Sequence, residues 1–353
     1  MQRSYLSVIA AAALPVLTRL DPESAHTLAL RGLRCLRPLW PPRDVPANLA
    51  VDCAGLKFAH PVGLAAGFDK NADYLDALGA IGFSHVEIGT VTPRPQPGNP
   101  KPRMFRIRAH EALVNRMGFN NKGADHVAAR MKQSAYRGIR GISIGKNFDT
   151  PIESAENDYV ECLRKLYEYA DYVAVNVSSP NTARLRELQS QGGLERIVGS
   201  LVDERAVLAR RFGRTVPLFV KVAPDLADAE LEALAAQLRA LAVDGVIATN
   251  TSNNLDEFSS ALPPGVSGGL SGRPLHRLSI RVIRALRALL GEELPIIGVG
   301  GIFGADDALA TLGAGANLIQ LYTGFAYRGS RLLDEILDAL AKAGAQPHGP
   351  STR

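Results

Sequence analysis

The segment AVNVSSPNT, residues 174–182, begins as an apolar run typical of a buried strand and ends in two amides, three hydroxyls and a proline. A buried strand tolerates so many polar side chains only where they have hydrogen-bond partners. At the end of a strand, they would instead project into a pocket and hydrogen-bond a planar ligand. The segment therefore predicts a strand whose carboxyl end lines a binding site.

The chain beyond residue 51 repeats this pattern, because short apolar runs end in polar residues or glycine and most are followed by an amphipathic stretch. The runs are His60–Phe68, His85–Thr92, Gly141–Asn147, Tyr172–Ser179, Pro217–Pro224, Gly245–Thr251, Pro295–Gly301 and Asn317–Gly324. The amphipathic stretches include Ile152–Tyr169, Leu194–Phe212, Asp228–Leu241, Pro274–Leu290, Ala305–Leu312 and Leu332–Ala343. Strands that are hydrophobic throughout and alternate with helices indicate a parallel sheet covered on both faces. Eight such units predict an α/β fold of the (β/α)8, or TIM, barrel type; a doubly wound open sheet is the alternative.

The same pattern divides the chain into segments. We expect the barrel in residues 51–343, a helical pair in 1–40, a proline-bearing linker in 41–50 and a flexible tail in 344–353. Between the second and third runs, Met104–Gly118 alternates in a way that predicts an excursion of two strands.

The N-terminal segment differs from the rest of the chain. Its apolar run, Val8–Leu17, is shorter than the ~20 residues that cross a bilayer, and Asp21 and Pro22 then predict a helix start. One interpretation is a helical pair that packs on its own domain, and another is a basic amphipathic helix in a membrane interface. A secretory signal peptide is the third, although no clear cleavage site follows the apolar run.

Composition narrows the function classes. With 46% hydrophobic residues the chain can bury a large core, and its net charge of +5 suits anionic ligands or an anionic membrane surface. Because no basic run is interleaved with aromatics, we expect no nucleic-acid partner. The three cysteines form no CxxC pair and the histidines no HxH or HExxH spacing, so we expect neither a disulfide framework nor a metal site.

The predicted strand ends carry the chemistry, because active sites of such barrels lie there. They offer amides, hydroxyls, lysines and glycines, without the carboxylate pair of glycosidases or a histidine beside a nucleophile. Gly300–Gly301 and Tyr322–Thr323 predict a phosphate cradle, and Lys221 should point into the barrel mouth. A phosphate site beside many amides suits flavin mononucleotide, whose reduced ring a lysine cation would stabilise.

Several long motifs extend this hypothesis. They are residues 20–26 (LDPESAH), 65–70 (AAGFDK), 87–93 (EIGTVTP), 115–121 (NRMGFNN), 176–182 (NVSSPNT), 248–251 (ATNT), 268–274 (GGLSGRP) and 298–302 (GVGGI). In these motifs the chain resembles the class 2, quinone-dependent dihydroorotate dehydrogenases, from about Leu20 to Gly329. The resemblance implies oxidation of dihydroorotate to orotate in pyrimidine biosynthesis, with FMN as prosthetic group and a quinone as electron acceptor.

The resemblance also implies roles for individual residues. Ser179 would be the catalytic base, with Thr182 and Phe119 in its proton relay. The implied substrate-binding residues are Lys70, Asn115, Arg116, Met117, Gly118, Phe119, Asn176, Asn181, Asn250 and Thr251. The implied FMN contacts are Ala66, Gly67, Phe68, Asp69, Lys70, Thr90, Ser143, Asn176, Lys221, Thr249, Gly272, Gly301, Tyr322 and Thr323. Ser143 departs from the family, which often has asparagine there. A serine hydroxyl can donate one hydrogen bond but cannot span two partners as an asparagine amide does.

The resemblance implies that the second half-reaction, in which quinone reoxidises the flavin, would involve the N-terminal segment. In the family two helices form an apolar tunnel for quinone, which implies a peripheral protein on the cytoplasmic side of a cell inner membrane. His26, Arg106 and Tyr322 match positions near the quinone end, and we expect a monomer. The alternatives are another flavin barrel, such as a dihydropyrimidine or dihydrouridine reductase, and a non-catalytic phosphate-binding barrel tethered to a membrane.

Overall fold

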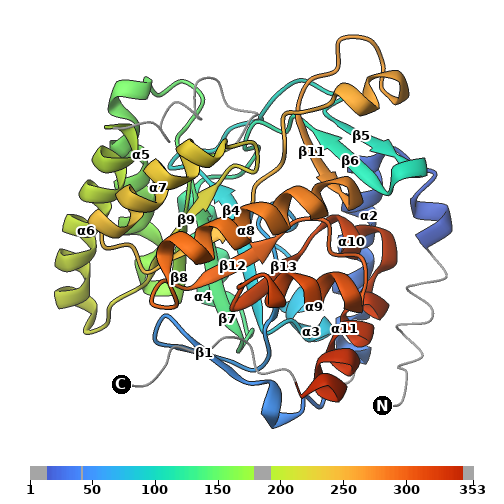
Figure 1. Ribbon diagram of the computed structural model, residues 1–353, viewed down its shortest axis with the longest axis horizontal. Helices are drawn as coiled ribbons and strands as arrows, with labels where there is room; N and C mark the ends of the chain where they lie inside the picture. The colour runs from blue at the N-terminus through green and yellow to red at the C-terminus, as the bar shows by residue number, and fades with distance from the viewer. Residues whose placement is uncertain (1–13, 41–42, 179–191, 345–353) are drawn as a thin grey trace.

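The structure is a computed structural model that describes residues 14–40, 43–178 and 192–344. Eight parallel strands close into a barrel (Figure 1) in the order β10-β12-β13-β3-β4-β7-β8-β9. Their bounds are β3 (Val62–Leu64), β4 (His85–Val91), β7 (Ile139–Ile144), β8 (Tyr172–Asn176), β9 (Leu218–Val222), β10 (Gly245–Ala248), β12 (Ile296–Val299) and β13 (Leu318–Leu321). The barrel prediction is therefore confirmed, and the open-sheet alternative is wrong.

Helices cover the outside of the barrel, where their apolar stripes pack against the strands. They are α3 (Leu75–Ile81), α4 (Ala124–Gln133), α5 (Ala155–Leu166), α6 (Gly193–Phe212), α7 (Asp228–Ala240), α8 (His276–Leu290), α9 (Ala305–Gly313), α10 (Thr323–Arg328) and α11 (Ser330–Ala343). Successive strand residues face opposite sides. In β8, Val173 and Val175 belong to the core under the helices, whereas Tyr172 and Ala174 belong to the cluster inside the barrel.

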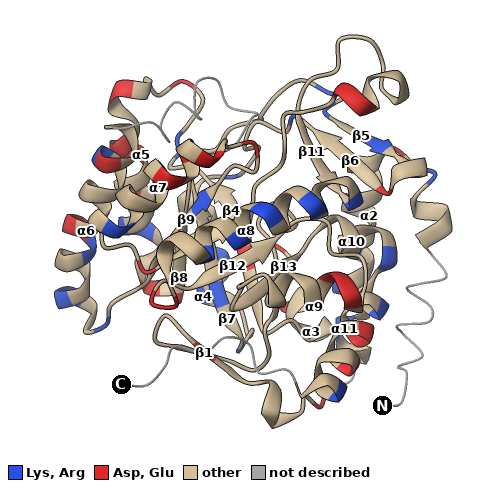
Figure 2. Ribbon diagram, viewed as in Figure 1, with Lys and Arg blue, Asp and Glu red and all other residues tan. Residues whose placement is uncertain are grey.

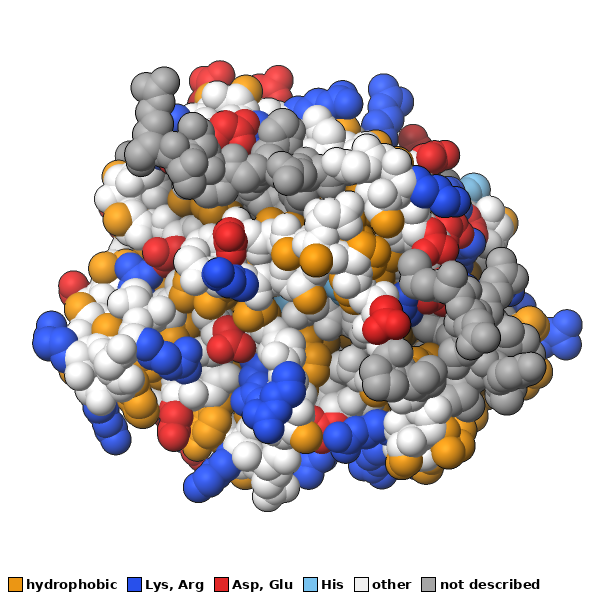
Figure 3. Space-filling view, turned by 90° about the horizontal axis from the view of Figure 1, so that it is seen from below, with side chains coloured by type: hydrophobic (Ala, Val, Ile, Leu, Met, Phe, Trp, Pro, Cys, Tyr) orange, Lys and Arg blue, Asp and Glu red, His pale blue; other side chains and the backbone are white. Residues whose placement is uncertain are grey.

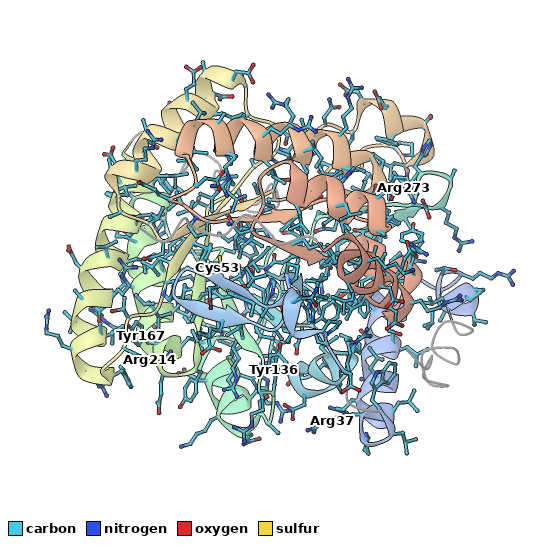
Figure 4. All side chains as sticks on the ribbon, turned by 60° about the horizontal axis from the view of Figure 1, so that its bottom comes forward. Arg37, Cys53, Tyr136, Tyr167, Arg214 and Arg273 are labelled. Carbon is cyan, nitrogen blue, oxygen red and sulfur yellow. The ribbon has the colours of Figure 1, made fainter. Side chains whose placement is uncertain are left out.

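A short hairpin closes the end of the barrel opposite the strands' carboxyl ends. Its strands, β1 (Val51–Cys53) and β2 (Leu56–Phe58), pair antiparallel, and Figure 4 shows the hairpin with Cys53 labelled. Cys53 and Phe58 pack against the interior cluster. Burial raises the pKa of the Cys53 thiol to about 12, and all three cysteines are free. Charges of both signs are interspersed on the face seen from below (Figure 3).

A small antiparallel sheet lies over the other end of the barrel (Figure 1), and we call it the roof. It consists of β5 (Met104–Ile107), β6 (Ala112–Asn115) and β11 (Gly269–Gly272), in the order β11-β6-β5. The predicted two-strand excursion is confirmed as β5 and β6. The third strand comes from the connection between β10 and α8, about 150 residues later, and the sequence pattern did not predict it.

The N-terminal helix α2 (Pro22–Leu36) begins as predicted, with the Asp21 carboxylate accepting a hydrogen bond of 2.8 Å from the Ser24 amide. Leu30 of this helix joins the main core. The Glu23 carboxylate makes two contacts of 2.7 and 3.1 Å with the Arg103 guanidinium, which fastens α2 beside the roof. Within the described ranges, no helix has the length and apolarity needed to span a membrane.

Candidate active site

A pocket opens at the carboxyl ends of the barrel strands, under the roof. It encloses about 1010 Å³ of space, open solvent at its mouth included, which is at the upper end of the usual small-molecule range of roughly 300–1,000 Å³. Its lining comes from seven of the eight barrel units, all but that of β7, and from the roof. The lining residues are Ala65, Ala66, Gly67, Lys70, Thr90, Asn115, Met117, Gly118, Phe119, Asn176, Lys221, Thr249, Asn250, Thr251, Ser271, Gly272, Leu275, Val299, Gly300, Gly301, Ile302, Gln320, Leu321, Tyr322, Thr323 and Gly324.

Most of the described residues predicted for substrate or FMN lie in this lining. Four do not: Phe68, Asp69, Ser143 and Arg116. Asp69 instead accepts hydrogen bonds from the backbone amides of residues 71, 73 and 74, and so fixes the loop before α3. Arg116 lines a neighbouring surface pocket with Lys101, on the opposite side of its loop from Asn115 and Met117.

A line of hydrogen-bonded side chains crosses the mouth of the barrel. Asn250, after β10, donates to the Asn176 amide oxygen at 3.2 Å, and Asn176 donates to the Thr90 hydroxyl at 2.8 Å. The Thr90 hydroxyl then contacts the Ser143 hydroxyl at 2.9 Å. Ser143 is fully buried behind Thr90, so its hydroxyl supports Thr90 and does not line the pocket.

The last described residues before the predicted base are also fixed by hydrogen bonds. Asn250 also donates to the Ser178 hydroxyl at 3.0 Å, and the Tyr159 hydroxyl donates to the Asn176 carbonyl at 2.7 Å. The end of β8 is therefore fixed from both sides. Ser179, Asn181 and Thr182 lie outside the described residues, and their roles stay predictions.

The deep end of the pocket, which we call the floor, consists of Lys221 from β9 and Gln320 from β13. Both are buried, and the Gln320 amide oxygen has no hydrogen-bond partner in the described part of the chain. Sequence reasoning identified Lys221 and missed Gln320. The signal for Gln320 is a polar residue in the middle of an otherwise apolar strand.

The predicted phosphate cradle is brought together on one side of the pocket. Gly272, Gly300 and Gly301 have φ angles of +107°, +135° and +69°, a conformation that favours glycine. The Thr323 hydroxyl donates to the Ser271 hydroxyl at 2.9 Å, and both residues line the pocket. Ser271, like Gln320, is a polar lining residue that the sequence motifs did not single out.

Lys70 lies in the lining with its ammonium 2.7 Å from the Gly67 carbonyl oxygen. Desolvation lowers the pKa of Lys70 to about 8; Glu23 opposes this shift and Arg103 adds to it. The lysine is thus a cation at neutral pH and loses its charge in the mildly alkaline range.

A row of rings connects the pocket to α2. The rings of His26 and Phe68 are 4.8 Å apart, and those of Phe68 and Tyr322 are 5.5 Å apart. The His26 Nε2 atom lies 2.8 Å from the Phe68 carbonyl oxygen. Burial lowers the pKa of His26 to about 4, so this neutral imidazole donates its Nε2 hydrogen. Arg106 lies apart from this row, where it donates to the Thr18 carbonyl at 2.6 Å.

Known proteins of one family match this chain along most of its length. The model of the dihydroorotate dehydrogenase family matches residues 48–343. A protein of Alkalilimnicola ehrlichii named dihydroorotate dehydrogenase (quinone) is 50% identical over 335 residues, which cover 93% of this chain and 97% of that protein. A protein of Marinobacter nauticus with the same name is 48% identical, with coverage of 93% and 97%.

A solved structure is similar as well. The crystal structure of DHODH from Eimeria tenella in complex with ferulenol superposes with a TM-score of 0.84 at 35% identity, covering 93% of this chain and 94% of that one. Fold and sequence agree, and the chain belongs to the dihydroorotate dehydrogenase family.

Proposed function

We propose that this protein oxidises dihydroorotate to orotate in pyrimidine biosynthesis, with FMN as prosthetic group and a quinone as final electron acceptor. The observation that carries the proposal is the pocket itself, which combines a line of amides, a glycine-rich side and two lysines. The names of the relatives support the same reaction and acceptor.

The residues present fit FMN. The side with Gly272, Gly301 and Thr323 would hold the phosphate, and Thr90, Asn176 and Lys221 would contact the ring. The Gln320 amide oxygen, which has no hydrogen-bond partner among the described residues, gives the floor an acceptor for a polar heterocycle. The bound flavin would supply a hydride acceptor.

The protein's own residues would bind the substrate and move its protons. Lys70 offers a cation to the anionic substrate, and the amides of Asn115, Asn176 and Asn250 orient its ring. Ser179 would take up a substrate proton, which requires a site that excludes water because serine is a poor base. Thr182 and Phe119 would border the proton's exit.

The N-terminal segment supports quinone access from a membrane surface. Of the six large hydrophobic side chains that are exposed in the described residues, four lie in this segment: Val16, Leu20, Leu28 and Leu39. The row of His26, Phe68 and Tyr322 leads from α2 to the pocket. We infer peripheral association with a cell inner membrane, with quinone approaching along α2.

Anaerobic addition of dihydroorotate to the purified protein tests the reaction. A bound flavin should show its visible absorbance, and this absorbance should bleach when dihydroorotate is added and return when a quinone analogue follows. Dihydrouracil and dihydrouridine serve as controls for the other flavin barrels. Flavin absorbance that persists with dihydroorotate would exclude the proposed activity, and a protein without flavin would favour a non-catalytic barrel.

Removal of residues 1–40 tests the role of the N-terminal segment. The shortened protein should still bleach with dihydroorotate, whereas its turnover with a long-chain quinone should be lost. Since Leu30 is part of the core, flavin content must be measured in parallel. Unchanged quinone turnover would refute the proposed route.

A further inference from the structure

Two charged side chains lie inside the barrel, although charged residues are found mainly on the surrounding helices and loops (Figure 2). Glu87 of β4 has no exposed surface, and Lys221 of β9 is 5% exposed. The Lys221 ammonium lies 3.8 Å from the Glu87 Oε1 atom. An isolated charge that is buried carries a large desolvation cost. Each of these two charges therefore needs an opposite charge or a bound ligand beside it.

The second oxygen of Glu87 is held from two directions. The Tyr172 hydroxyl donates to Oε2 at 2.9 Å, and the Gln320 side-chain amide donates to the same atom at 2.8 Å. Gly141 makes room for Tyr172, because a Cβ atom there would lie 2.2 Å from the tyrosine ring. Because Tyr172 and Gln320 both donate to Oε2, the Glu87 carboxylate is held as a hydrogen-bond acceptor. Its other oxygen, Oε1, faces Lys221.

This arrangement places Glu87 behind the floor of the pocket, of which Lys221 is part. Lys221 lines the pocket and Glu87 does not. Glu87 therefore acts on a ligand only through the lysine and through Gln320. No role for Glu87 follows from the reaction described above.

We propose that Glu87 is a positioning residue that keeps Lys221 protonated at the floor, so that a flavin bound there is reduced beside a permanent cation. The inference rests on the proposed function, since it concerns the flavin. It assigns to the barrel interior a task beyond packing.

The proton balance makes the proposal measurable. Reduction by two electrons with uptake of one proton leaves one negative charge on the flavin ring. With Glu87 ionised, Lys221 already carries its proton and takes up none. With glutamine at position 87, the buried lysine has no counter-ion, and we expect its uncharged form beside oxidised flavin. The negative charge of the reduced ring then draws a second proton onto the lysine Nζ atom.

Other titratable groups that face the pair are either neutral or common to all variants. Burial raises the pKa of Tyr172 well above its usual value and that of Tyr322 to about 12, and burial lowers the pKa of His85 to about 3. Lys70, in the same pocket, has a pKa lowered to about 8 by burial and titrates in the range of interest. Variants must therefore be compared with the wild type at each pH.

The test is the pH dependence of the flavin midpoint potential, measured on the flavin-loaded proteins with indicator dyes. Glu87→Gln should double the slope of potential against pH over part of the neutral to alkaline range, because proton uptake rises from one to two per two electrons. The double variant Glu87→Gln/Lys221→Met should return to the wild-type slope. The surface variant Glu335→Gln controls for loss of a carboxylate elsewhere. A wild-type slope in Glu87→Gln would overturn the proposal.

A second measurement covers the case in which Glu87→Gln retains no flavin. The double variant should then unfold at a higher temperature than Glu87→Gln alone. A lysine buried without a counter-ion must either keep an unpaired charge or give up its proton, and methionine avoids both costs. A double variant no more stable than the single one would refute the charge pairing. Loss of bleaching by dihydroorotate in the wild type would instead refute the proposed function, while the stability comparison would still test the pair.

Discussion

Substitution of Glu23 by glutamine should loosen α2 from the barrel. The Glu23 and Arg103 side chains are 18% and 8% exposed, and two contacts join them. Breaking a buried ion pair costs about 3–5 kcal/mol. We expect about 3 kcal/mol, the lower end of that range, because Arg103 keeps the carbonyls of Pro97 and Asn99 as acceptors. At 1.4 kcal/mol for each factor of ten, local opening of α2 should become about a hundredfold more frequent.

Hydrogen exchange of the peptide that spans α2, followed by mass spectrometry, measures this opening. Lys101→Gln is the matched control, because Lys101 contacts the same carboxylate at 3.4 Å while its own side chain is 68% exposed. An exposed pair contributes about 0–1 kcal/mol, so exchange in this control should increase less than tenfold. The reasoning is refuted if the two variants exchange α2 amides at the same rate.

The remaining predictions concern the site and its pH dependence. Ser179→Ala should slow flavin reduction by dihydroorotate roughly 100- to 10,000-fold in stopped-flow absorbance, the range of general-base catalysis; a normal rate would remove Ser179 from the mechanism. With the pKa of Lys70 lowered to about 8 by burial, the half-saturating dihydroorotate concentration should rise above that pH, and Lys70→Met should show no such rise. The pKa of His26 is lowered by burial from 6.5 to about 4, so the unfolded chain binds the proton more tightly and stability falls as pH drops through that interval. The variant His26→Gln keeps a donor for the Phe68 carbonyl, and its free energy of unfolding, measured by urea titration, should fall less between pH 6.5 and about 4. An equal fall in the variant and the wild type would contradict a buried, neutral His26.

The barrel was predictable because its strands are apolar on both faces and alternate with amphipathic helices. Strand ends were less predictable. The run Tyr172–Ser179 was predicted as one strand, but β8 ends at Asn176, because the ladder stops where the chain enters the pocket mouth. The roof strand β11 was missed for another reason. Gly269–Gly272 contains two glycines, and its partner β6 is distant in sequence.

Site residues were predictable as motifs and less so one by one. A motif consists of consecutive residues, but the side chains of consecutive residues point in different directions, so only some of them reach the pocket. Phe68 and Asp69 follow pocket residues, yet one packs against rings and the other binds loop amides. Glu87 and Gln320 carry the opposite lesson, because each is flanked by apolar neighbours on both sides within its strand. Their shared surroundings become visible only when β4 and β13 are placed in one barrel.

The roof has a consequence for the order in which the site is built during synthesis. Strand β6 leaves the ribosome long before β11, with which it pairs from Asn115 opposite Gly269 to Ala112 opposite Gly272. Until then β6 has one unpaired edge, and unpaired edges invite association with other chains. Contacts so distant in sequence also form slowly. The roof over the pocket is thus completed only after six barrel strands have been synthesised. Before that stage, a nascent chain has no complete pocket in which to retain a ligand.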